Sequence, residues 1–432
     1  MTTTSSPAPT PTAAAPASAA RAGRGSFDAV LRGRAGLLGM AGFWLATRAL
    51  MLFLLVTPFR GNSVRTEVTN TYHNWYKVLV TWTMPHNDVM WQYPPGAAAI
   101  FLSPKFVPVL TYFQGFVALT VLCDALITIG LVRAARRPDG SMAGALLWLG
   151  ALPLLLGLPF ARYDVQVTLL AVASLLCLRY RTRLGGVFAG LGAMVKVWPL
   201  LTLIGAPRGK STREAILSAV AAAVALFAIF AAFFRDTLGF LGNQGDRGVQ
   251  IESLGGSALM FGKLTGIWPG KINYQYGAFE HVGPYVSSVA RLSLGLTVVG
   301  FLWLLLWRVK AKRWTTATPA DAALCAILLF TVTSRVISPQ YMIWLLGLAA
   351  VCLTSTRTTQ RPVAWLLVVV TALSTVIYPL VYDSDILAGT ALGTFLMCAR
   401  NGLLAAAAVW SGIRLWKATA SPLPAAAAGT AR

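Results

Sequence analysis

The chain has 432 residues, of which 56% are hydrophobic and 12% charged, and its formal net charge is +22. Its mean hydropathy of +0.65 excludes an ordinary soluble globular protein and is typical of a polytopic membrane protein. The basic residues fall in short clusters between apolar runs, for example 133–137, 208–213 and 308–313. Cytoplasmic loops of membrane proteins are enriched in Lys and Arg, so this pattern predicts a membrane topology and argues against nucleic-acid binding.

The chain divides into two tails and one membrane domain. Residues 1–35 begin with an Ala-, Pro-, Ser- and Thr-rich stretch that predicts a disordered cytoplasmic tail, and no cleavage pattern of a signal peptide follows the first apolar run. The sequence predicts an all-α transmembrane bundle over 36–415, outer loops at 58–108 and 235–285, and a cytoplasmic tail at 416–432. The ten predicted crossings are about 36–57, 109–132, 141–160, 164–181, 214–234, 286–309, 318–334, 340–356, 362–380 and 388–413. Both termini are then cytoplasmic, in a multi-pass protein of the plasma membrane.

One apolar segment, 184–206, conflicts with a simple crossing. Basic clusters at 179–183 and 208–213 flank it, and both are expected on the cytoplasmic side. A Lys and a Pro interrupt its middle, at Lys196 and Pro199. We therefore expect a re-entrant pair of half-helices with Lys196 near the tip; a kinked full span is the alternative.

The first outer loop is the first candidate for catalysis. It is too long for a simple connector, and it carries Glu67 and Asp88 in a chain with only 14 acidic residues. The predicted topology also places Asp164 and Glu252 on the same outer face. Transfer of a sugar from a phosphate-linked donor to an alcohol requires a carboxylate that accepts the alcohol's proton. Glu67 is the first candidate for this base and Asp88 the second.

The same reaction requires cations that hold the phosphate leaving group and polar or aromatic groups that hold the sugar. The candidates for donor and phosphate binding are Arg162, Lys196, Arg335 and Tyr93. The candidates for acceptor or sugar binding are Tyr72, Trp75, Trp91, Asp164, Arg247, Gln250, Glu252 and Gln340. Simpler roles stay open: Trp75, Trp91 and Tyr93 as interfacial aromatics, Asp88 as a cap, and Arg335 as an interfacial cation.

Other polar residues have structural interpretations. Arg48 and Arg400–Asn401 lie within apolar spans, and we expect a pairing with Asp124 for either of them. The three histidines and five cysteines show no metal-ligand spacing, so the sequence predicts no metal and no cofactor.

Five stretches carry a resemblance to a known family. They are WQYPP (91–95), LPFARYDVQVTLLAVASLL (158–176), GLGAMVKVWPLL (190–201), GVQIESL (248–254) and SRVISPQYMIWLL (334–346). Their order resembles the GT-C membrane glycosyltransferases, and within them glycosyltransferase family 87, which includes actinobacterial α-mannosyltransferases that use polyprenyl-phosphate-mannose. The resemblance implies an inverting enzyme with a loop acid as its base and without a metal-binding Asp-x-Asp motif. The family's loop acid is usually an Asp shortly before a Tyr, whereas this chain has Glu67 before Tyr72.

The sequence thus predicts transfer of a hexose, with mannose favoured, from a polyprenyl-phosphate donor to a lipid-linked or glycan acceptor on the extracytoplasmic face. A transporter or flippase for lipid-linked sugars is the alternative, because some transporters also have broken helices at mid-membrane. No second copy of the broken segment 184–206 is present, which disfavours a transporter built from paired halves. A non-catalytic membrane scaffold would leave the acids of the first outer loop without a role.

Overall fold

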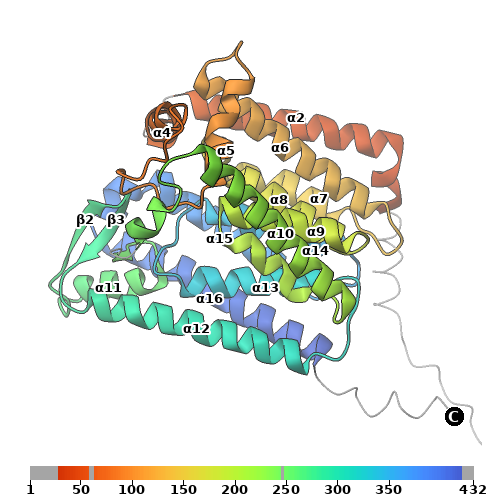
Figure 1. Cartoon of the computed structure of the whole chain (residues 1–432). Helices are drawn as coiled ribbons and strands as arrows, with labels where there is room; N and C mark the ends of the chain where they lie inside the picture. The colour runs from red at the N-terminus through yellow and green to blue at the C-terminus, as the bar shows by residue number, and fades with distance from the viewer. Residues whose placement is uncertain (1–27, 58–62, 245–247, 421–432) are drawn as a thin grey trace, which may run out of the picture.

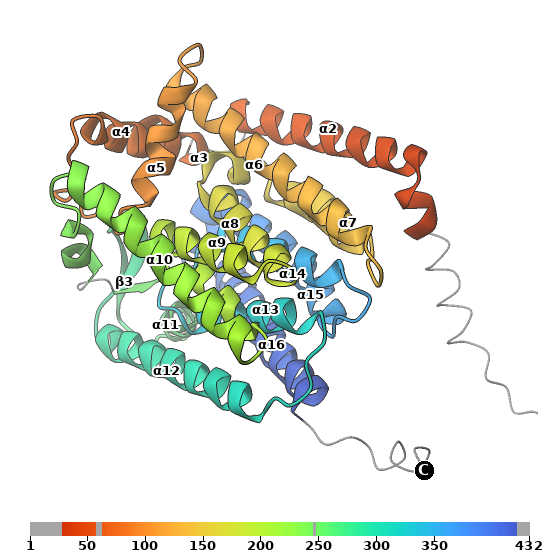
Figure 2. The same cartoon turned by 45° about the vertical axis from the view of Figure 1, so that its right-hand side comes forward.

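The computed structural model describes residues 28–57, 63–244 and 248–420. Most of this chain forms helices that lie side by side as a bundle (Figures 1 and 2). Strands β2 (Lys271–Gln275) and β3 (Ala278–Val282) and short helices such as α4 (His73–Leu79) gather at one end of the bundle, on the left of Figure 1. We call this the loop end, and we call the opposite end, where the 133–137 and 308–313 clusters lie, the basic end.

Six described helices are long and apolar enough to cross a membrane. They are α2 (Arg34–Val56), α6 (Tyr112–Ala135), α10 (Lys210–Phe233), α12 (Val286–Lys310), α15 with its extension η7 (Arg361–Thr375 and Val376–Leu380) and α16 (Ala391–Thr419). Several of them leave large apolar side chains uncovered, such as Leu292 and Leu302 of α12, which are 64% and 59% exposed. Such surfaces are unfavourable in water and favourable in lipid, so the chain is a membrane protein.

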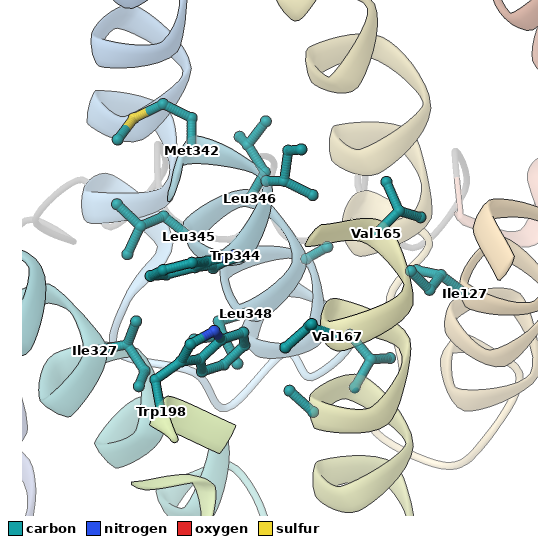
Figure 3. Packing of buried hydrophobic residues seen from close by; sticks show 14 of the residues in the cluster. Ile127, Val165, Val167, Trp198, Ile327, Met342, Trp344, Leu345, Leu346 and Leu348 are labelled. Carbon is teal, nitrogen blue, oxygen red and sulfur yellow. The ribbon is translucent and has the colours of Figure 1, made fainter. Parts of the chain in front are cut away.

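Shorter helices fill the middle of the bundle. They are α7 (Ala143–Ala151), α8 (Asp164–Leu178), α13 (Thr318–Thr333) and α14 (Tyr341–Leu353). Every residue of α14 after Tyr341 is buried, and Figure 3 shows Leu345, Leu346 and Leu348 of this helix packed among apolar side chains of its neighbours. With 13 residues, α14 is about 20 Å long, which is less than the ~30 Å of bilayer hydrocarbon. A central helix can be this short because protein, not lipid, surrounds it.

The predicted crossings coincide with observed helices, but the predicted count of ten is not established. Six of the ten correspond to the long helices, and the other four correspond to α7, α8, α13 and α14. Length and composition alone do not show whether these four reach both membrane surfaces.

The segment that the sequence marked as broken changes direction at Lys196. Helix α9 (Thr182–Val195) ends there, and the 3-10 helix η5 (Trp198–Gly205) follows. Pro199 lacks a backbone N–H and disfavours helical geometry in the residue before it, which explains why α9 does not continue. Helices α9 and α10 run in the same direction: a Cβ on Gly186 would meet Ala215, and a Cβ on Gly190 would meet Ala219. The chain must therefore return to the basic end between the end of α9 and the start of α10.

Contacts between basic segments hold the basic end together. Arg183 pairs with Glu214 across the starts of α9 and α10, with an N–O distance of 3.0 Å. Arg208 donates to the carbonyl of Val309 over 2.8 Å, and Arg357 pairs with Asp139 over 2.8 Å. These contacts bring clusters that are far apart in the sequence to one side of the bundle.

A buried ion pair joins the first two long helices. Arg48 donates through Nε and Nη2 to the two carboxylate oxygens of Asp124, over 2.8 and 2.9 Å. The indoles of Trp44 and Trp148 also donate to this carboxylate, each over 2.7 Å. The predicted pairing of Arg48 with Asp124 is therefore confirmed, whereas Arg400 contacts Glu252 instead.

The connections at the loop end contain a small antiparallel sheet of order β1-β3-β2, where β1 is Val249–Gln250. Gln275 pairs with Ala278, and Tyr276 and Gly277 between them have φ angles of 52° and 76°. Two residues with positive φ form the tight turn that suits the twist of a hairpin. The sequence predicted a loop over 235–285 and not these strands, because a short exposed hairpin contains no long apolar run.

The remaining short elements connect the helices. They are α3 (Ser63–Thr66), η1 (Glu67–Tyr72), α5 (Ala97–Leu102), η2 (Ser103–Phe106), η3 (Leu152–Leu155), η4 (Leu158–Ala161), η6 (Gly239–Gln244), α11 (Leu254–Leu264) and η8 (Tyr382–Leu387).

Candidate active site

A cavity of about 690 Å³ opens at the loop end, where α9 ends and where α8 and α14 begin. It exists because these central helices stop here while the outer elements continue around them. The first loop, the β2–β3 hairpin, residues 334–341 and residues 378–383 form its walls. The lining includes eleven of the fourteen candidate residues: Glu67, Tyr72, Trp75, Tyr93, Arg162, Asp164, Lys196, Gln250, Glu252, Arg335 and Gln340.

 The other three candidates are not among the residues that line the cavity. Asp88 and Trp91 do not line it, and Arg247 lies outside the described residues.

Glu67 and Arg162 form one side of the cavity. Glu67 is the first residue of η1, a π-helical turn, and its side chain is 26% exposed. Its Oε2 lies 3.7 Å from Nη2 of Arg162, which precedes α8. Burial lowers the pKa of Arg162, but the neighbouring Glu67 and Tyr72 raise it by more, so this guanidinium stays charged. Because Glu67 is partly exposed and lines the cavity, its carboxylate lies where a bound molecule can reach it.

Asp164 and Lys196 meet at the floor of the cavity. Oδ1 of Asp164 accepts from Nζ of Lys196 over 2.7 Å and from the indole of Trp344 over 2.6 Å. The carboxylate is completely buried, and its Oδ2 has no hydrogen-bond partner in the described part of the chain. Lys196 is a predicted phosphate-binding residue, and in this structure its charge is paired with Asp164.

Aromatic rings surround the Lys196 ammonium. Nζ lies 4.6 Å from the ring centroid of Tyr163 and 4.7 Å from that of Trp344, distances at which a cation is attracted to the ring face. Trp344 stacks on Tyr341 at 3.9 Å and on Trp198 at 5.1 Å between centroids. Figure 3 shows the Trp344 ring of α14 facing Trp198. This stack fixes Trp344, and with it the hydrogen bond to Asp164.

The aromatics of the first loop have two roles. Tyr72, Trp75 and Tyr93 line the cavity, whereas Trp91 is 1% exposed and packs edge-on against Trp75 with centroids 5.2 Å apart. Asp88 accepts from the indole of Trp75 over 2.7 Å and from the backbone N–H of Met90 over 2.9 Å. The Asp88 carboxylate thus holds the loop in shape outside the cavity, while its candidacy as a base stays an untested prediction.

Glu252 is buried and also lines the cavity. The Arg400 guanidinium donates to the Glu252 carbonyl over 3.0 Å and to Oε2 over 3.5 Å, and the Tyr382 hydroxyl donates to Oε1 over 3.4 Å. Asn401 donates to the same carbonyl over 3.1 Å. Burial raises the pKa of Glu252 to about 7, although Arg400 and the Tyr382 hydrogen bond oppose this effect. Arg400 and Asn401 therefore serve the loop end and do not contact Asp124.

Gln250 and Arg335, two further candidates, connect the segments 248–254 and 334–341. The backbone N–H of Gln250 donates to the Arg335 carbonyl over 3.0 Å, and its side chain donates to Ser338 Oγ over 3.4 Å. Arg335 and Gln340 flank this contact and line the cavity. The stretches 248–254 and 334–341, which are far apart in the sequence, thus form one wall.

Sequence reasoning missed several lining residues. Tyr163, Trp198, Tyr274, Trp344, Tyr378 and Tyr382 were not among the candidates. A local signal existed for Trp344, which lies one helical turn after Tyr341 and therefore shares its face. No local signal existed for Tyr274, Tyr378 or Tyr382, because only tertiary packing brings them to the cavity. Among the described residues, no three His, Cys, Asp or Glu side chains are grouped so that they could hold a metal ion.

Comparison with known proteins identifies the family of this region. Residues 91–339, more than half of the chain, match the family model described as Glycosyltransferase family 87. The matched region includes Arg162, Asp164, Lys196 and Arg335, whereas Glu67 precedes it. No curated protein matches the chain. These findings give no support to a transporter or flippase.

Proposed function

The chain belongs to glycosyltransferase family 87, and we propose from this membership and from the cavity that it transfers a hexose, with mannose favoured, from a polyprenyl-phosphate donor. The acceptor is an alcohol of a lipid-linked molecule or a glycan. Family membership indicates a glycosyltransferase; the donor, the sugar and the inverting outcome are our proposals.

Glu67 is the proposed general base. Its side chain is partly exposed and lines the cavity, and this observation carries the assignment. In the reaction the acceptor hydroxyl gives its proton to Glu67 as its oxygen attacks the anomeric carbon of the donor. The bond from that carbon to the phosphate oxygen breaks, and its electron pair leaves with the phosphate. Arg162 pairs with Glu67 over 3.7 Å and holds its side chain in place beside the bound acceptor.

The leaving phosphate requires positive charge near the cavity floor. We assign this role to Arg335 and to Lys196, with Asp164 holding Lys196 in place. The positive charge of Arg162, which is paired with Glu67, is a further contribution to the binding of the leaving phosphate. Tyr72, Trp75 and Tyr93 provide ring faces against which a sugar can lie. Hydrogen bonds to the acceptor or the sugar come from Gln250, Glu252 and Gln340. We assign the same role to Arg247.

We also propose that the cavity faces the extracytoplasmic side of the plasma membrane. The basic clusters gather at the opposite end, as the positive-inside rule requires of the cytoplasmic side. Both termini would then be cytoplasmic, and α7, α8, α13 and α14 would complete ten crossings. The parallel course of α9 and α10 supports a re-entrant pair over residues 182–205, with Lys196 at its tip.

The test is sugar transfer in membranes that contain the protein, supplied with labelled polyprenyl-phosphate-mannose. Glu67→Gln should reduce transfer by about 10²- to 10⁴-fold, the usual contribution of a positioned base. Asp88→Asn and Glu252→Gln identify the base among the other loop acids, and Asp236→Asn is the matched control, because Asp236 is 48% exposed and does not line the cavity.

Transfer by well-expressed Glu67→Gln at the wild-type rate would eliminate Glu67 as the base. Loss in Asp88→Asn alone would move the assignment to Asp88. Parallel reactions with polyprenyl-phosphate-linked glucose and arabinose test the sugar: faster transfer of either one would eliminate mannose as the favoured substrate.

A further inference from the structure

A second cavity, of about 400 Å³, lies at the basic end, between the start of α10 and the end of α12. We call it the basic-end pocket. Its lining consists of three arginines, two small or polar residues and two aliphatic residues: Arg208, Gly209, Thr212, Arg213, Ile216, Leu217 and Arg308. It is separate from the site above and has no role in the proposed transfer reaction.

Three arginines line this pocket without an acidic partner. Within the described residues, no carboxylate lies within ion-pair distance of Arg208, Arg213 or Arg308. Arg208 and Arg308 also face the same indole, that of Trp314, with distances of 5.7 and 4.9 Å to its centroid. Like charges held this close repel one another, and a bound anion would turn that repulsion into attraction.

Hydrogen bonds hold two of the three arginine side chains in place, and all three retain donors for a ligand. Nη2 of Arg308 donates to Thr212 Oγ1 over 2.7 Å, and Nη2 of Arg208 donates to the Val309 carbonyl over 2.8 Å. Nη1 of Arg308 is buried and has no hydrogen-bond partner in the described structure. A buried donor without a partner is costly, so an acceptor that reached Nη1 would stabilise this side chain.

The start of α10 adds to the positive potential. This helix has 24 residues, and its N-cap, Gly209, provides no side chain to accept from the first backbone N–H groups. The unpaired N–H groups of a helix start and the helix dipole both favour an anion.

An apolar surface continues from the pocket along the bundle. Ile216 and Leu217 line the pocket and are 49% and 57% exposed, and Val220 follows on α10 with 53%. On α12, Val309 and Leu305 are 71% and 56% exposed. The ligand that fits both parts has an anionic head and apolar chains.

We propose that the basic-end pocket binds the phosphate of an anionic phospholipid, with the acyl chains along the exposed apolar side chains of α10. The three guanidinium groups bind the phosphate oxygens, and the bound headgroup relieves the repulsion between Arg208 and Arg308. The occupant is a membrane lipid and not a free phosphate ion, because the apolar surface begins at the pocket itself.

The experiment is native mass spectrometry of the purified full chain in detergent, with dioleoyl phosphatidylglycerol or dioleoyl phosphatidylcholine added. Wild-type protein should retain one phosphatidylglycerol more tightly than phosphatidylcholine. The variant Arg208→Gln/Arg213→Gln/Arg308→Gln should bind phosphatidylglycerol about tenfold or more weakly, since the loss of one charged hydrogen bond already approaches that factor. The triple variant could misfold, so the single variant Arg213→Gln is measured beside it. Its fold should be intact, because the Arg213 side chain is exposed and makes no hydrogen bond or ion pair within the described structure.

Lys310→Gln is the matched control, because Lys310 ends α12, is exposed and does not line the pocket. Equal retention of phosphatidylglycerol by wild type, Arg213→Gln and the triple variant would overturn the proposal, as would equal loss in Lys310→Gln. A third arm adds inorganic phosphate alone: thermal protection that depends on the three arginines, without preferential lipid retention, would overturn the lipid as the occupant.

Discussion

Replacing Asp164 with Asn should both destabilise the protein and reduce sugar transfer. The substitution preserves the shape of the side chain but removes the charge that Lys196 faces at 2.7 Å. The two side chains are 1% and 15% exposed, so water does not replace the lost partner. Removal of one member of a buried ion pair costs about 3–5 kcal/mol, since it leaves the other charge buried without compensation. The remaining amide oxygen can still accept from Trp344, which places the expected loss at the lower end of this range.

A double-mutant cycle isolates the contribution of the pair. The free energy of unfolding is measured for wild type, Asp164→Asn, Lys196→Met and the double variant, with tryptophan fluorescence during titration with sodium dodecyl sulfate. Each single variant should lose about 3 kcal/mol, and the double variant should lose clearly less than the sum of both, because it leaves no buried charge unpaired.

The exposed pair Arg183–Glu214 is the control for this cycle. Its N–O distance of 3.0 Å is similar, but Arg183 is 76% exposed, so Glu214→Gln should cost at most about 1 kcal/mol. Additive losses for Asp164→Asn and Lys196→Met, or a loss no larger than that of Glu214→Gln, would refute the reasoning.

Two further predictions concern other parts of the bundle. Burial raises the pKa of Glu252 from 4.5 to about 7 in the folded protein. Between these two pH values the folded protein therefore binds one proton that the unfolded chain has lost. The free energy of unfolding should fall by up to about 3 kcal/mol as the pH rises from 4.5 to 7, and then level off. Glu252→Gln should remove this slope, and an unchanged slope in unfolding measurements across the interval would contradict the assignment. Gly190→Ala should destabilise by about 1–3 kcal/mol, because its Cβ would lie 2.1 Å from the Ala219 carbonyl oxygen and force α9 away from α10. Gly39→Ala, whose Cβ would meet nothing within 4 Å, should not destabilise; equal thermal stability of both variants would contradict the close parallel packing.

The positions of the long helices could be predicted from the sequence, because lipid-facing helices need long apolar runs. The runs at 36–57, 109–132 and 286–309 reappear as α2, α6 and α12 within a few residues. The break near Lys196 was also predictable, because Pro199 acts on the backbone directly before it. The hairpin at 271–282 was not predicted, since Ile272, Tyr274 and Tyr276 alternate with polar residues over only a short and largely exposed stretch, which long apolar runs do not reveal.

The site was predicted in its composition but not in its pairings. Glu67, Arg162 and Arg335 were all identified as candidates because charged residues are rare in this chain. The sequence did not indicate that Lys196 pairs with Asp164, or that Arg400 pairs with Glu252 and not with Asp124. Lys196 and Asp164 are 32 residues apart along the chain, and Arg400 and Glu252 are 148 residues apart.

By itself, the sequence determined that this is a helical membrane protein with acids in its two long loops and aromatics in the first of them, because hydropathy and charge clusters act locally along the chain. Tertiary structure alone decided which of those acids line the cavity. Glu67 remains partly exposed there, while Asp88 is engaged by Trp75 and Met90 outside it. The reason is geometric: the cavity forms where the central helices end, and the position of those ends depends on packing between segments that are distant in the sequence.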